Sequence, residues 1–203
     1  MPRSTPPADK ILDTALDLAE TCGWERLHLH DVAEALHCDL AAIARHYRQK
    51  DDLVEAWLDR ADQALFERAK GADLAMLAPA KRLEELLMAW LGGMAVHRAL
   101  TGQMLLYKFE LGHIHLQAGA LLRVSRTVQW WREAARRHNL HLSRVAEESL
   151  LSAVFLRTFI HWLRQPQADD AALRALLRQQ LRRGPLGWLL RQAADVAKRP
   201  HLG

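Results

Sequence analysis

The chain has 203 residues, of which 50% are hydrophobic and 26% are charged, a composition that is typical of globular proteins and excludes a disordered chain. Two cysteines, Cys22 and Cys38, are too few for a disulfide scaffold, and no apolar run reaches the ~20 residues that a membrane-spanning helix requires. With no apolar signal core after Met1, we expect a cytoplasmic location.

The net charge of +4 is divided unevenly along the chain. Residues 1–70 hold nine Lys and Arg against fourteen Asp and Glu, whereas residues 71–203 hold nineteen against ten. The N-terminal third is therefore acidic and the remainder is basic.

The first seventy residues show helical spacing of apolar side chains and no strand-like alternation. A first helix ends at Gly23, a second covers Leu29 to Leu36, and a third begins after Asp39, a good N-cap residue. A long helix follows over residues 51–70. The stripe that the first helix is expected to bury consists of Ile11, Leu12, Ala15, Leu16 and Ala19.

The remaining residues continue the helical pattern, which predicts an all-α fold. After a loop through Pro79, helices are expected over residues 81–98, 100–111, 120–138, 143–164, about 169–183 and 186–198. Gly92-Gly93 and Gly184-Pro185 interrupt this series.

Residues 11–54 contain a series of spaced positions: Ile11-Leu-Asp-Thr-Ala-Leu-Asp-Leu-Ala, Gly23, Asp31-Val32-Ala33, Arg45-His46-Tyr47, Lys50 and Leu53. In these positions the segment resembles the N-terminal domain of the TetR family of helix-turn-helix regulators. The likeness implies an N-terminal three-helix helix-turn-helix domain over 1–50 and a larger C-terminal ligand-binding and dimerisation domain over 51–203, with 51–70 as the connecting helix. It also implies a homodimer, with most of the interface from residues 143–183.

The implied function is a DNA-binding transcriptional regulator that responds to a small apolar ligand, with duplex DNA as a partner. The predicted DNA-binding residues are His28, His30, Leu40, Ala41, Ala42, Arg45, His46, Tyr47, Arg48 and Lys50.

This sequence departs from the family pattern around its third helix. His37 stands where the family usually has glycine, Asp39 replaces a small hydroxyl residue, and the face that is usually polar contains Leu40, Ala41, Ala42 and Ala44. Base readout needs hydrogen-bond donors and acceptors, which alanine lacks, although Ala42 could contact a thymine methyl group.

The alternative is a TetR-fold protein that does not bind DNA and instead binds lipid or isoprenoid cargo and a membrane surface, like accessory proteins of ubiquinone biosynthesis. The C-terminal helices carry an arginine series at helical spacing, followed by Trp188, Leu189 and Leu190. They form either a solvated face of the dimer or a peripheral membrane contact.

The predicted ligand pocket is lined by aromatic residues and methionines of the second domain, unless these simply form its core. They are Trp90, Met94, Met104, Tyr107, Trp130, Trp131, Phe155, Phe159 and Trp162.

No catalytic residues, cofactor or metal site are predicted. The pairs His28/His30 and His113/His115 lack the cysteines or carboxylates that would complete a metal site, and no phosphate-binding glycine loop or nucleophile motif occurs.

Overall fold

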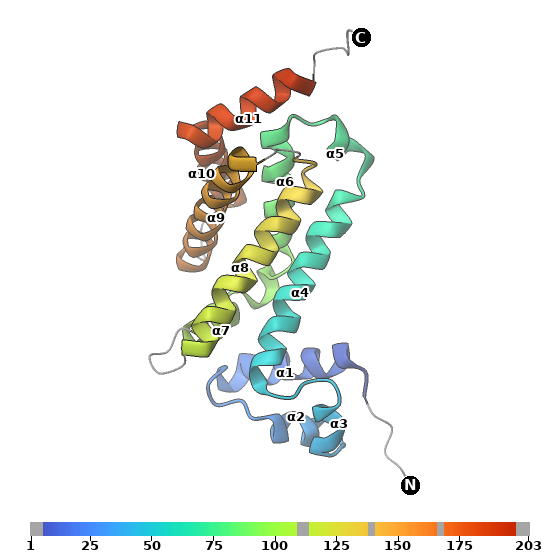
Figure 1. Cartoon of the computed structure of the whole chain (residues 1–203). Helices are drawn as coiled ribbons and strands as arrows, with labels where there is room; N and C mark the ends of the chain where they lie inside the picture. Colours follow the sequence, from blue (N-terminus) through green and yellow to red (C-terminus); the bar gives the residue numbers. More distant parts are fainter. Residues whose placement is uncertain (1–5, 109–113, 138–140, 166–168, 198–203) are drawn as a thin grey trace. The chain divides into compact units, whose positions relative to one another are not determined.

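The computed structural model describes residues 6–108, 114–137, 141–165 and 169–197, and all regular secondary structure in these ranges is helical (Figure 1). The predicted all-α class is therefore confirmed. In chain order the helices are α1 Ala8–Cys22, α2 Leu29–Ala35, α3 Leu40–Ala44, α4 Lys50–Ala69, α5 Ala72–Met76, α6 Pro79–Gly92, the 3₁₀ turn η1 Ala95–His97, α7 Arg98–Lys108, α8 Ile114–Ala134, α9 His141–Arg164, α10 Asp170–Arg182 and α11 Gly184–Ala197.

The first helix follows the prediction from its apolar spacing. The five residues of the expected stripe, from Ile11 to Ala19, are all buried in α1. Gly23 ends the helix with a φ of 86°, and its N–H donates to the carbonyl of Ala19. A residue with a β-carbon would be strained at this positive φ, so glycine ends α1 without strain.

The segment between α4 and α6 was predicted wrongly as a loop. A short helix, α5, occupies Ala72–Met76, and Pro79 lies at the start of α6. The reason is that proline fixes φ near its helical value and has no N–H to satisfy, which suits the first position of a helix. Helix α8 also begins at Ile114, six residues before its predicted start.

The chain divides into two compact units. Unit 1 contains Met1–Arg60 and Met94–Ala118, and unit 2 contains Ala61–Gly93 and Gly119–Gly203. Unit 1 therefore adds the first half of α4, and α7, to the three N-terminal helices. The functional division that we place after residue 50 stays a prediction.

Neither unit contains, within its described residues, a helix that is both long enough and apolar enough to cross a lipid bilayer.

Candidate nucleic-acid interface

The turn between α2 and α3 is built without glycine. His37 occupies the left-handed region with a φ of 51°, and the following Cys38 N–H donates to the carbonyl of Ala33. The carboxylate of Asp39 then accepts the N–H of Ala42 at 2.7 Å, which confirms the predicted N-cap of α3. The backbone of His37 thus adopts a conformation that costs a non-glycine residue about 1–2 kcal/mol.

The exposed residues around α3 include most of the predicted DNA contacts. Leu40 is 53% exposed, and Ala41 and Ala44 are also exposed. Arg45, His46 and Arg48 follow at the surface. At the start of α2, the exposed rings of His28 and His30 stack at a centroid distance of 5.2 Å, and His30 lies 3.2 Å from the Asp31 carboxylate. This surface offers two guanidinium groups, three imidazoles and apolar side chains.

Two predicted contacts face inward instead. Ala42 is 5% exposed, so its methyl group supports the packing of α3 and does not reach the surface. Tyr47 is 7% exposed, and its hydroxyl donates to the carbonyl of Ala8 at 3.0 Å. Burial, reinforced by the charge of Asp9, raises the pKa of Tyr47. Both side chains lie on the buried face of the helix-turn-helix, together with Ile43.

Lys50, predicted as a phosphate contact, is turned toward the α1–α2 turn. Its ammonium donates to the carbonyls of Trp24 and Glu25, at 2.5 and 3.1 Å. The same nitrogen lies 5.2 Å from the ring centroids of both Trp24 and Tyr107. Burial lowers the pKa of Lys50, and the charges of Cys22 and Glu25 oppose that effect.

Helix α7 makes further contacts within unit 1 that the sequence did not reveal. The ammonium of Lys108 is 2% exposed and lies 2.5 Å from Glu55 and 3.2 Å from Asp51. The indole N–H of Trp57 donates to the hydroxyl of Thr101 at 2.9 Å. The one available signal was a lysine at the end of an apolar stretch. If the fold buries such a lysine, carboxylates are expected beside it, because lysine is rarely buried without a partner.

The predicted ligand-pocket residues are divided between the two units. Met94, Met104 and Tyr107 belong to unit 1, where both methionines are buried. In unit 2, Trp90 contacts the rings of Phe155 and Phe159 at centroid distances of 5.0 Å each. Trp131 and Trp162 extend this cluster, whereas Trp130 is 48% exposed and contacts Phe66 edge-on. The five clustered rings of unit 2 therefore pack against one another as a core.

Two buried ionic groups lie in unit 2. Asp62 forms an ion pair with Arg123 at 2.8 Å and accepts hydrogen bonds from Trp90 Nε1 and Thr127. Glu147, fully buried, receives two hydrogen bonds from Arg137 and one from Arg132. Sequence reasoning identified neither group, since partners separated by 10 to 65 residues leave no local pattern.

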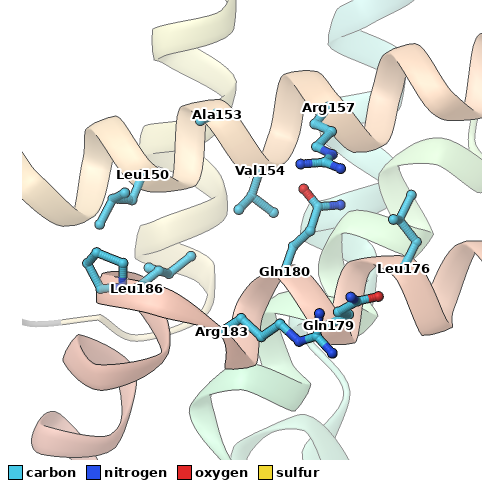
Figure 2. Close-up of a pocket in the computed structure, with 10 residues that line it drawn as sticks. Leu150, Ala153, Val154, Arg157, Leu176, Gln179, Gln180, Arg183 and Leu186 are labelled. Carbon is cyan, nitrogen blue, oxygen red and sulfur yellow. The ribbon is translucent and has the colours of Figure 1, made fainter.

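A surface groove of about 420 Å³ lies between α9, α10 and α11 (Figure 2). Leu150 and Leu186 lie toward one end of the groove and Leu176 toward the other, with Arg157 and Arg183 at its edges. Its lining includes none of the residues that we predicted for a ligand pocket, so that set of residues stays a prediction.

Within the described part of the chain, no group of three or more His, Cys, Asp or Glu side chains is placed so that it could hold a metal ion. His113 and the side chain of His115 lie outside the described residues.

The chain matches no family model and no curated protein. Among solved structures it is similar to a TetR transcriptional regulator from Nitrosomonas europaea ATCC 19718, with 39% sequence identity, a TM-score of 0.76, and coverage of 93% of this chain and 98% of that chain. A bacterial regulatory protein of the tetR family from Rhodococcus RHA1 is 17% identical, with a TM-score of 0.44 and coverage of 91% and 95%.

Proposed function

Because the chain belongs to the TetR family of transcriptional regulators, we propose that it is a homodimer whose α2 and α3 helices bind duplex DNA. The observation that carries this proposal is the capped helix α3, which leaves Arg45 and Arg48 exposed beside it. Guanidinium groups are suited to phosphate because they donate several hydrogen bonds from a fixed planar fork.

The chemistry of the surface defines how DNA would be recognised. Arg45 and Arg48 contact phosphates, and His46, next to Arg45 in the sequence, is an exposed polar side chain that can bond to a base edge. Leu40 and Ala41, which are exposed, replace Ala42 as the apolar groups that can meet thymine methyl groups. With few donors available, a large share of the specificity would come from DNA shape and deformability.

We expect weak binding to random duplex at low ionic strength and a marked loss in an Arg45→Ala/Arg48→Ala double variant. In a dimer the double variant removes four cations, so the salt slope of log Kd should fall in magnitude by about 3 to 4. Fluorescence anisotropy of a labelled duplex, titrated with salt, measures this slope. Arg191→Ala, an exposed arginine of α11, is the matched control and should retain the wild-type slope.

Absence of binding by the wild-type protein at low salt would contradict the DNA-binding proposal and favour the alternative of an apolar-cargo protein. That alternative has less support at α11, because Leu186 and Leu190 of its apolar face are already buried in unit 2. The small apolar effector of the regulator also stays a prediction, since the clustered rings of unit 2 contact one another.

The homodimer is proposed to form through the outward faces of α9 and α10. Val145, Ala153, Leu156 and Ile160 share one exposed face of α9 at helical spacing. The exposed residues of α10 include Ala171, Ala172 and Ala175, whose small side chains permit close helix approach.

The charges of α10 are self-complementary. Asp169 and Asp170 lie at its start, and Arg182 and Arg183 lie at its end. Two copies of α10 that run antiparallel about a two-fold axis near Ala175 would bring the acidic end of one next to the basic end of the other.

Ile160→Asp is expected to convert the dimer to a monomer, because each interface would then bury two carboxylates without partners. Sedimentation velocity at micromolar concentration measures the change, with a dissociation constant raised by at least about 100-fold. Leu121→Asp changes an exposed leucine on α8 of unit 2 and is the control that should remain dimeric. A dimer that survives Ile160→Asp would place the interface elsewhere.

A further inference from the structure

We propose that Lys50 is a positioning residue that locks the α1–α2 turn onto α7, and not a contact to DNA phosphate. The proposal rests on the proposed DNA-binding function for one of its two measurements only. All the residues that form the lock belong to unit 1: Trp24, Glu25, Lys50, Gln103 and Tyr107.

The first step is the hydrogen bonding of the ammonium. A lysine ammonium has three N–H donors and no acceptor. In this structure Nζ donates to the two consecutive carbonyls of Trp24 and Glu25. Two of its three N–H groups are therefore engaged by backbone carbonyls of the same unit, which holds the ammonium at the α1–α2 turn.

The second step is the aromatic enclosure of the same charge. The rings of Trp24 and Tyr107 each lie 5.2 Å from Nζ, within the range of favourable cation–π interaction. Trp24 is completely buried, so its ring presents an environment of low polarity to the cation. The interaction is stronger here than it would be at an open surface, because less water competes for the ammonium.

The third step is the second attachment of the turn. The backbone N–H of Trp24 donates to the side-chain oxygen of Gln103 at 2.8 Å. Gln103 and Tyr107 are four residues apart and therefore lie on the same face of α7. One helical face thus holds the Trp24 N–H directly and, through Lys50, the Trp24 carbonyl.

These contacts make Lys50 the link between three segments. The residue itself starts α4, its carbonyl acceptors lie in the turn that leads into α2, and Tyr107 belongs to α7. Since α2 begins at Leu29, only a few residues after Glu25, the lock fixes the entry of the helix-turn-helix.

The test compares Lys50→Met with Arg48→Met in the full chain. Methionine retains the length of the lysine side chain but has no charge or donor. We expect Lys50→Met to lower Tm by about 5 °C while the salt slope of binding to random duplex stays at the wild-type value. Arg48→Met, which changes an exposed cation, should keep the wild-type Tm and lose about 2 from the slope of the dimer. The opposite pattern for Lys50→Met, a reduced slope with an unchanged Tm, would overturn the proposal.

A second series keeps the proposal testable if Lys50→Met does not fold, or if the wild-type protein does not bind DNA. Tyr107→Leu removes the ring and should lower Tm, whereas Tyr107→Phe keeps the ring and should not. Where Lys50→Met folds, Tyr107→Leu should have little further effect in that background, because the partner of the ring is already absent. Equal Tm values for Tyr107→Leu and wild type, or full additivity with Lys50→Met, would refute the lock without bearing on DNA binding.

Discussion

Asp62→Ala is expected to lower the free energy of unfolding by about 3–5 kcal/mol, the range observed when one partner of a buried ion pair is removed. The carboxylate lies 2.8 Å from the guanidinium of Arg123, and the two residues are 5% and 6% exposed. Its Oδ1 also accepts the indole N–H of Trp90 and the hydroxyl of Thr127. Truncation therefore removes a charge partner and an acceptor for two buried donors. Urea denaturation followed by tryptophan fluorescence measures the loss.

The controls separate the charge of Asp62 from its hydrogen bonding. Asp62→Asn keeps an oxygen for Trp90 and Thr127 and should lose less than Asp62→Ala. Adding Arg123→Met to Asp62→Ala should recover part of the stability, because the buried guanidinium that Asp62 neutralises would then also be absent. Asp59→Ala, an exposed aspartate one turn earlier on α4, should change stability by about 0.5 kcal/mol or less. A loss of that size for Asp62→Ala as well would show that the ion pair is not needed for stability.

Glu147→Ala is the second substitution with a large expected effect, also about 3–5 kcal/mol. Glu147 is 0% exposed, and Arg137 binds its two carboxylate oxygens at 3.0 and 2.8 Å. Arg132 approaches the same carboxylate at 3.4 Å. Both arginines are nearly inaccessible to water, so the substitution leaves two buried cations without this counter-charge. Thermal unfolding monitored by circular dichroism, together with a urea titration, measures the effect.

The neighbouring Glu148 provides the matched comparison. It is only half-buried and pairs with Gln129 at 3.2 Å, so Glu148→Ala should cost less than about 1 kcal/mol. Glu147→Gln should fall between the two, because the amide retains one acceptor oxygen but no charge. Equal effects of Glu147→Ala and Glu148→Ala would contradict the role assigned to the buried carboxylate.

The helices of unit 1 could be predicted because their signals are local. The buried stripe of α1 repeats at helical spacing, Gly23 follows its last turn, and Asp39 stands immediately before α3. The predicted membership of the TetR family depended on the same short-range positions and is confirmed by the likeness at 39% identity. Helix α5 and the role of Pro79 were missed because proline was interpreted as a loop residue although it also starts helices.

The inward orientation of Lys50 could not be predicted in the same way. Lys50 has the sequence context of a surface cation, and only the positions of Trp24 and Tyr107, 26 residues before it and 57 after it, turn it inward. The aromatic residues of unit 2 were recognised as a group, but a sequence does not distinguish rings that line a space from rings that fill it. The predicted pocket and the predicted DNA contacts both remain to be tested.

The composition of unit 1 bears on how this protein can be recombined with its relatives. Residues from α7, including Thr101, Gln103, Tyr107 and Lys108, hold Trp57, Trp24, Lys50 and Glu55. A chimera that exchanged only about the first fifty or sixty residues would separate these pairs. The grafted segment would then pack against an α7 whose side chains come from the other protein. An exchange of the N-terminal helices with those of a relative therefore has to transfer two stretches of sequence together, residues 1–60 and 94–118.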